Sequence, residues 1–145
     1  MVRMVREAGI EQEVVVGSAG TSDFHIGRSP DPRSTAAAAA RGTTLAGEGR
    51  QVTAADFAAW DLLLCADRSN AGALLSLAPD AAAAEKVRLL REFDPASAAA
   101  GELDVPDPYF GDDGFEEVLD VIEAACAGLL ERLQRRDDPA TRPVP

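Results

Sequence analysis

The clearest pattern in the chain is a stripe of apolar side chains in its last third. Apolar residues recur there at intervals of three or four, with Glu, Asp and Arg between them, as on one face of a surface helix. The stripe consists of Phe115, Val118, Leu119, Ile122, Cys126, Leu129 and Leu133. We therefore predict a long amphipathic helix ending near Leu133, followed by a polar, proline-bearing and disordered tail over residues 135–145.

Capping residues and glycines mark the shorter helices. Asp31-Pro32 combines a side chain that caps helix starts with a proline at the first helical position, and Gly42 stands where such a helix would end. A helix is therefore predicted over residues 33–41. Three further helices are predicted over residues 2–8, over residues 54–59, and from a cap at Ser69 or Asn70 to Leu77. The first of these has no capping residue in front of it.

Short apolar runs predict the strands of a parallel sheet. The runs cover residues 14–16, 61–65 and 87–90, and their alternation with helices is typical of an α/β domain, here residues 1–134. Residues 94–113 are rich in Pro, Gly and Asp and are predicted to form a long functional loop. A parallel sheet is built from strand–helix–strand crossovers. Because the opening helix has no strand before it, we expect the first central strand to be absent from this chain.

Composition narrows the function classes. The net charge of −11 argues against nucleic acid or an anionic membrane as a partner, since both attract clustered Lys and Arg. No apolar run approaches the roughly 18 residues of a membrane span, and the first ten residues lack the apolar core of a secretory signal. Two cysteines and one histidine imply neither a disulfide framework nor a metal site. We expect a cytoplasmic protein.

Three segments together carry a family resemblance. They are VVVGSAGTSDFHIGRSPDPR (14–33), RQVTAADFAAWDLLLCADRSN (50–70) and DVPDPYFGDDGFEEV (104–118). In this order and spacing the chain resembles the low-molecular-weight protein tyrosine phosphatases. The resemblance implies a single doubly wound α/β domain with a four-stranded parallel sheet, which hydrolyses phosphotyrosine proteins or small aryl phosphates without metal or cofactor.

The resemblance also implies a loop of pattern C-x5-R-S/T after the first strand, whose thiolate attacks phosphorus and whose backbone N–H groups hold the phosphate. No such loop is found in the chain. Cys126 and Arg132 have the right spacing, but they lie on the predicted helix, where Leu133 replaces the hydroxyl residue. Cys65 is followed by Ala71 at the arginine position, and Ser22 in Ser22-x5-Arg28-Ser29 is not a cysteine. We therefore expect this chain to be catalytically inactive.

The remaining site residues are assigned by resemblance. Asp107 corresponds to the general acid and base; its alternative is an ordinary Asp-Pro turn. Tyr109 and Phe24 correspond to aromatic walls for a phenyl ring, with ordinary packing as their alternative. The residues that correspond to braces of the nucleophile loop are Ser18, Asp67 and Arg50. For Ser18 and Asp67, turn or cap chemistry is an equally good explanation.

Two other functions stay open. The chain could be a pseudo-phosphatase, a binding module that keeps an aromatic-walled surface. An arsenate-reductase-like protein is a weaker alternative, because Cys65 has no second cysteine a few residues on, although an exposed thiol there could be redox-sensitive. A missing central strand would leave unpaired strand edges, so self-association by edge pairing is also expected.

Overall fold

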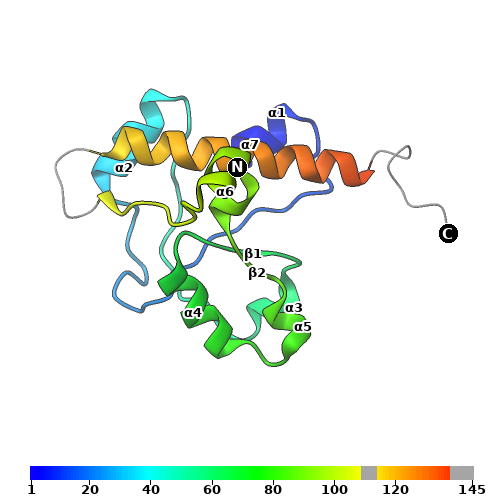
Figure 1. Cartoon of the computed structure of the whole chain (residues 1–145). Helices are drawn as coiled ribbons and strands as arrows, with labels where there is room; N and C mark the ends of the chain where they lie inside the picture. Colours follow the sequence, from blue (N-terminus) through cyan, green and yellow to red (C-terminus); the bar gives the residue numbers. More distant parts are fainter. Residues whose placement is uncertain (109–113, 138–145) are drawn as a thin grey trace.

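The computed structural model of the chain describes residues 1–108 and 114–137 (Figure 1). In chain order the elements are α1 (Val2–Glu7), α2 (Pro32–Ala40), α3 (Asp56–Ala59), β1 (Leu63–Cys65), α4 (Arg68–Leu77), α5 (Ala81–Ala84), β2 (Val87–Leu89), the 3-10 helix η1 (Leu90–Phe93), α6 (Pro95–Ala100) and α7 (Phe115–Asp137). Figure 1 shows α7 on one side of the strands and α4 on the other. Helices on both faces of a parallel sheet confirm the predicted α/β class.

The sheet of the described residues consists of β1 and β2, which are parallel and pair Leu63 with Val87 and Cys65 with Leu89. Leu63 donates its backbone N–H to the carbonyl oxygen of Lys86 at 2.9 Å. Both strands follow the predicted runs, shortened to three residues each. The sheet described here is therefore narrower than the four strands that the resemblance implied.

The predicted strand over residues 14–16 is wrong. The chain passes from 14 to 19 without a turn or bend, but it forms no ladder with another described segment. Val15 is 76% exposed. The nearest pairing is an isolated bridge between Gly20 and Gln51. Three consecutive β-branched residues favour an extended chain, but a strand also needs a neighbour that satisfies its backbone groups.

Helix starts follow their capping side chains. Asp31 accepts the N–H of Arg33 at 2.8 Å at the start of α2, which confirms the predicted cap, and α1 has no side-chain cap, as expected. The cap predicted at Ser69 or Asn70 is wrong. The helix begins at Arg68, so Asp67 is the residue before its first turn and Ser69 and Asn70 lie within it. The side chain of Asp67 accepts the backbone N–H of Asn70 at 2.7 Å, as a capping residue does.

Three short helices, α5, η1 and α6, were not predicted, and the end of α7 differs from the prediction. Asp80 caps α5, and Asp94 caps α6 within the segment expected to be a loop. α7 continues to Asp137, beyond the predicted start of a disordered tail at residue 135. An ion pair of 2.8 Å between Arg135 and Glu131, one turn apart, supports this polar extension. The rest of the predicted tail lies outside the described residues.

The core has its centre beneath the paired strands. Buried side chains from both strands, from the helices beside them and from the segment before α3 form one cluster: Val52, Phe57, Cys65, Leu74, Ala83 and Leu89. On the other face, α7 packs on η1 so closely that a Cβ on Gly128 would lie 1.9 Å from the carbonyl oxygen of Phe93. Gly128 is therefore required by the approach of two backbones.

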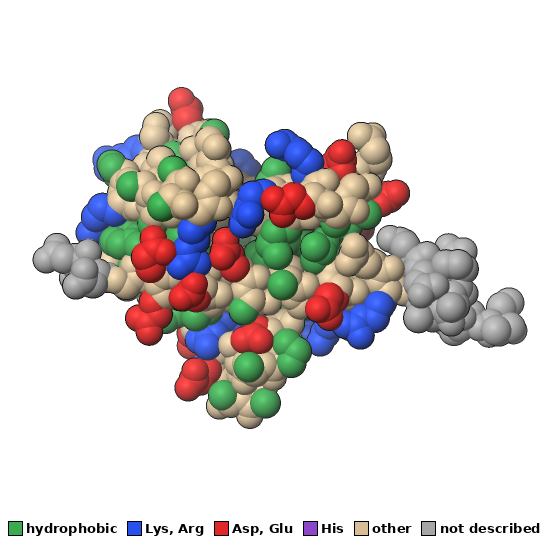
Figure 2. Space-filling view, turned by 90° about the horizontal axis from the view of Figure 1, so that it is seen from above, with side chains coloured by type: hydrophobic (Ala, Val, Ile, Leu, Met, Phe, Trp, Pro, Cys, Tyr) green, Lys and Arg blue, Asp and Glu red, His purple; other side chains and the backbone are tan. Residues whose placement is uncertain are grey.

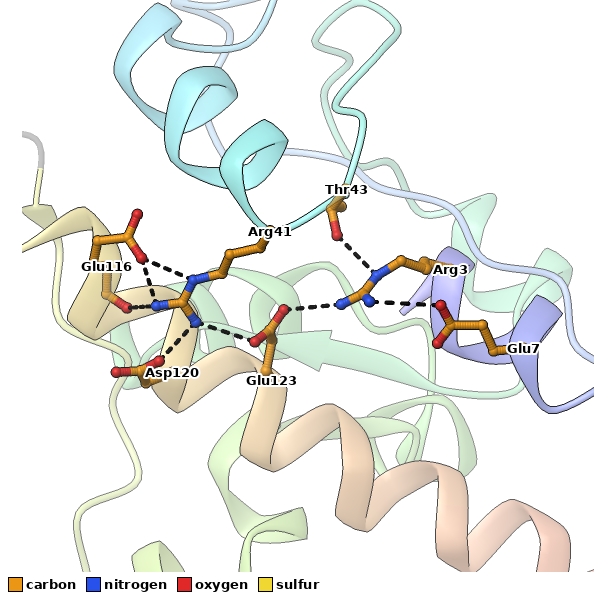
Figure 3. A network of polar contacts seen from close by, with 7 residues as sticks. All are labelled: Arg3, Glu7, Arg41, Thr43, Glu116, Asp120 and Glu123. Carbon is orange, nitrogen blue, oxygen red and sulfur yellow. Dashed lines mark hydrogen bonds and ion pairs between the residues drawn. The ribbon is translucent and has the colours of Figure 1, made fainter.

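Charged contacts fasten α1 and α2 to α7 (Figure 3). Arg41 follows α2 and contacts three acidic side chains of α7, among them Asp120 at 2.7 Å. Arg3 on α1 reaches Glu123 at 3.2 Å and the hydroxyl of Thr43 at 3.1 Å. Figure 2 shows acidic and basic side chains interspersed on this face. The network holds α1 and α2 against α7.

Candidate active site

A buried carboxylate holds Arg50 in place. The guanidinium of Arg50 lies 2.8 Å from Asp56, and Asp56 also accepts the backbone N–H of Thr53 at 2.8 Å and the indole N–H of Trp60 at 3.2 Å. Arg50 is the main reason that the pKa of the Asp56 carboxyl lies well below its usual range, with the Thr53 hydrogen bond next. Asp56 therefore stays charged and fixes the position of the arginine.

Arg50 and Ser18 both line a groove of about 400 Å³. One wall is the extended segment 14–18, and the other is β1 with Leu62 before it. Leu74 of α4 and Leu129 of α7 also line the groove. The structure thus brings together two of the three predicted loop braces.

The third brace, Asp67, lies just beyond the end of β1 and serves as the cap of α4. Its alternative explanation, cap chemistry, is therefore confirmed. The bracing role stays a prediction.

The segment that carries Asp107 is attached to the same end of β1. Val105 donates its N–H to the carbonyl oxygen of Ala66 at 2.8 Å. Next to it, Arg68 contacts Asp104 twice, through its guanidinium at 2.6 Å and its backbone N–H at 3.0 Å. These contacts place the exposed Asp107 two residues after a fixed point at the carboxyl end of the strand, the edge where open α/β sheets bind ligands.

Arg91 fixes the same segment from inside the molecule. Its side chain is 11% exposed, and it donates to the carbonyl oxygen of Asp104 at 2.7 Å and to the hydroxyl of Ser97 at 3.1 Å. A buried arginine with paired donors is a rigid support. The segment that leads to Asp107 is therefore held at Asp104 by two arginines.

The aromatic walls are only partly described. Phe24 is 77% exposed, so its alternative explanation, ordinary core packing, is wrong. Its loop is joined to residues 49–51 by the bridges of Ile26 with Gly49 and of Gly20 with Gln51. Tyr109 lies outside the described residues. An aromatic ring open to solvent is available for a planar ligand.

Neither cysteine has the character of a nucleophile. Burial, with the charge of Asp67 second, raises the pKa of the Cys65 thiol to about 11, and burial also raises the pKa of Cys126. Attack on phosphorus requires a thiolate with a lowered pKa. The spacing of Cys126 and Arg132 is indeed a coincidence of the helix, because Arg132 lies over the ring of Phe93 at 5.1 Å. The expectation of an exposed, redox-sensitive Cys65 is wrong, since that residue is 3% exposed.

No cluster of three metal-ligating side chains occurs among residues 1–108 and 114–137. Within the same ranges, no helix is long and apolar enough to cross a bilayer.

Sequence reasoning missed the residues that support the site. The helix over residues 54–59 was predicted, but the contact of Asp56 with Arg50 was not. Arg91 gave no signal, because a single arginine after a short strand resembles any surface residue. The pairing of Arg68 with Asp104 crosses 36 positions of the chain and becomes visible only in the fold.

Comparisons with known proteins agree on one family. The sequence pattern described as "Low molecular weight phosphotyrosine protein phosphatase" matches residues 1–138. A low molecular weight protein-tyrosine-phosphatase of Streptomyces coelicolor is 45% identical over 133 residues, which are 91% of this chain and 80% of that protein. The low molecular weight phosphotyrosine protein phosphatase of Sus scrofa is 33% identical over 134 residues, 91% of this chain and 82% of that protein.

Solved structures give the same result for the fold. A protein tyrosine phosphatase from Entamoeba histolytica superposes with a TM-score of 0.83 at 28% identity, over 91% of this chain and 83% of that chain. YfkJ from Bacillus subtilis superposes with a TM-score of 0.84 at 28% identity, over 94% of this chain and 83% of that chain.

Proposed function

This chain belongs to the low molecular weight phosphotyrosine protein phosphatase family, and we propose that it presents the general-acid side of a site for phosphotyrosine or aryl phosphate esters. The observation that carries the proposal is the attachment of the Asp107 segment to the end of β1 through Val105 and Ala66. The exposed ring of Phe24 supplies one aromatic surface.

The proposed chemistry has two steps. A thiolate from a C-x5-R-S/T loop attacks phosphorus, and the phosphorus–oxygen bond to the aryl group breaks while Asp107 donates its proton to the leaving oxygen. In the second step Asp107, now a carboxylate, takes a proton from water as the water attacks the phosphocysteine. This step releases inorganic phosphate and the thiolate. An acid on a loop beside the phosphate site, and not within it, suits both steps.

For the chain as it stands we propose no turnover. The cysteine-containing sequences CADRSNA (65–71) and CAGLLER (126–132) do not form the required loop, and both thiols are buried with raised pKa values. Without a thiolate no phosphocysteine forms, and Asp107 has no leaving group to protonate.

The test uses p-nitrophenyl phosphate and two forms of the protein. We expect the 145-residue chain to show no turnover, and turnover that disappears on Cys65→Ser would contradict this. We expect a fusion that places an apolar strand and a C-x5-R-S loop ahead of residue 1 to hydrolyse the ester. In that fusion Asp107→Asn should lower kcat by about 100-fold or more, while Asp112→Asn, in the same acidic stretch, should have little effect. Equal effects of the two substitutions would remove Asp107 from its proposed role.

A second candidate function is a non-catalytic binding module. The exposure of Phe24 favours it, because a 77% exposed phenyl ring leaves an aromatic face available to a planar group of a partner. A folded fusion that binds phosphotyrosine but does not turn over p-nitrophenyl phosphate would favour this function over the enzymatic one.

We propose the cytoplasm as the place of action, because both cysteines are free thiols, as in reducing compartments.

We also propose that copies of the chain associate at high concentration through the strand edge beside residues 14–18. Sedimentation at rising protein concentration tests this association, and a monomer at every concentration would contradict it.

A further inference from the structure

A cleft separate from the groove beside β1 lies between α7 and the segment that follows β2. η1 packs on α7 there, and α6 begins directly after η1. We call this hollow the α7–η1 cleft. Its volume is about 570 Å³, a size common among small-molecule sites. No residue lines both hollows.

One part of the α7–η1 cleft is apolar. Ala124, Ala127 and Gly128 line it from α7. Phe93 and Pro95 line it from the opposite side. These five side chains have no polar groups, so a ligand makes only apolar contacts with them. An aromatic ring packs well against such side chains and, edge to face, against another aromatic ring.

The other part of the cleft carries charge. Glu131, Arg132 and Arg135 line it, and at about 1.5 Å per residue they lie roughly 10 to 16 Å along α7 from Ala124. Glu131 pairs with Arg135 at 2.8 Å, so Arg132 gives this part a single net positive charge. The chain as a whole has a net charge of −11. This part of the cleft therefore attracts an anion locally, against the charge of the rest of the surface.

Arg132 is held in place but has no acidic partner. Two guanidinium groups lie over the ring of Phe93, that of Arg88 at 5.9 Å from its centre and that of Arg132 at 5.1 Å. Arg88 pairs with Glu92. Arg132 makes no ion pair within residues 1–108 and 114–137. Because the ring contact orients the planar guanidinium, its N–H groups can bind a carboxylate with little further loss of side-chain freedom.

From these features we propose that the α7–η1 cleft binds a small aromatic carboxylate. The carboxylate accepts hydrogen bonds from the guanidinium of Arg132, in the two-pronged geometry that arginine offers to carboxylates. The aromatic ring lies in the apolar part, against Pro95 and Ala127. All the residues that carry the proposal lie between positions 88 and 135, and the binding does not depend on the proposed phosphatase chemistry.

The probe is 3-phenylpropanoate, and the readout is the amide shifts of the ¹⁵N-labelled full chain in a nuclear magnetic resonance titration. We expect saturable shifts around Phe93, Ala127 and Arg132, with a Kd of about 1 mM or tighter for a ligand of this size. The uncharged 3-phenylpropanamide has the same shape and should bind at least about tenfold more weakly. Sodium acetate at equal concentration controls for ionic strength.

Three results of this titration would overturn the proposal. Equal binding of the acid and the amide would show apolar contact without recognition of the charge. Equal shifts with acetate would show that the ring is not recognised. An absence of saturable shifts at the cleft would show that no aromatic carboxylate binds there.

The two arginines over Phe93 provide a matched pair of variants. Arg132→Gln should weaken binding of 3-phenylpropanoate by about tenfold or more, because a charge-assisted hydrogen bond is lost. Arg88→Gln removes a guanidinium from the same ring, but one that already pairs with Glu92, and should leave binding within about twofold. Thermal melting confirms that each variant is folded. Undiminished binding by a folded Arg132→Gln variant would overturn the assignment of the carboxylate.

A second pair of variants tests the position of the ring. Ala124 is exposed and lines the apolar part of the cleft, whereas Ala82 is exposed on α5 and lies outside it. Ala124→Leu fills the space proposed for the ring and should weaken binding by about tenfold. Ala82→Leu should leave binding within about twofold. Equal binding by the two folded variants would contradict the placement of the ring in this cleft.

Discussion

The edge of β1 that faces β2 and the edge that faces residues 14–18 have the same backbone chemistry but different surroundings. On the first side three residue pairs form a parallel ladder above a buried cluster. On the second side Leu64 is 38% exposed and Val15 is 76% exposed across a groove. Local sequence would favour the opposite arrangement, since Val-Val-Val has a stronger strand preference than Leu-Leu-Cys.

The difference shows that pairing and burial determine strand formation here. On the paired side the strands exchange backbone hydrogen bonds and their side chains are buried. The open side has neither a partner strand among the described residues nor buried side chains at Leu64 and Val15. The same asymmetry should be measurable as a difference in stability between matched substitutions on the two sides.

The largest expected difference in stability is between alanine substitutions of two phenylalanines. Phe57 is 3% exposed in the cluster under the paired strands, and Phe24 is 77% exposed on the loop after the open segment. Phe57→Ala should lower the free energy of unfolding by about 3–5 kcal/mol, and Phe24→Ala should change it by less than about 0.5 kcal/mol. Urea denaturation measures both. Similar losses for the two variants would show that the open side is packed as well.

Alanine substitutions of two helical glycines should give the next largest difference in stability. A Cβ at Gly128 would lie 1.9 Å from the carbonyl oxygen of Phe93, whereas a Cβ at Gly72 would meet nothing within 4 Å. Gly128→Ala should destabilise the protein by about 2–3 kcal/mol through overpacking, and Gly72→Ala should stabilise it by about 0.5–1 kcal/mol. Thermal denaturation distinguishes the two signs. A stable Gly128→Ala variant would show that α7 is not packed tightly on η1.

The smallest expected effect concerns the carboxylate beside the groove. Arg50 lowers the pKa of Asp56 in the folded state, so the stability from this contact is present above the ordinary aspartate pKa of about 4 and is lost as pH falls below it. Asp56→Asn should cost about 1–2 kcal/mol at pH 7 and should flatten the decline in melting temperature below pH 4. Asp61→Asn, at an exposed neighbour, is the control. A decline that is unchanged in Asp56→Asn would assign the acid sensitivity to other groups.

Sequence predicted the features that depend on local chemistry. Asp31-Pro32 marked the start of α2, and the apolar stripe identified α7, because capping and helical periodicity act within one or two turns. The family resemblance identified Asp107, Ser18 and Arg50, and the fold then placed the last two in one groove.

Contacts between segments far apart in the chain could not be predicted from the sequence. The failure of residues 14–16 to form a strand depends on a neighbour, which no local pattern reveals. Arg91 acts through the carbonyl oxygen of Asp104, and main-chain partners leave no trace in side-chain identity. Asp67 was visible as a cap candidate, yet its choice over Ser69 follows from where β1 ends.

Amide hydrogen exchange of the free chain tests directly whether β1 has one paired and one open edge. We predict slow exchange at Leu63, whose N–H donates to the carbonyl oxygen of Lys86 at 2.9 Å, and fast exchange at Leu64, Val15 and Val16 under the same conditions. Protection of Leu64 and Val15 equal to that of Leu63 would contradict it, because the second edge would then be paired in the free protein.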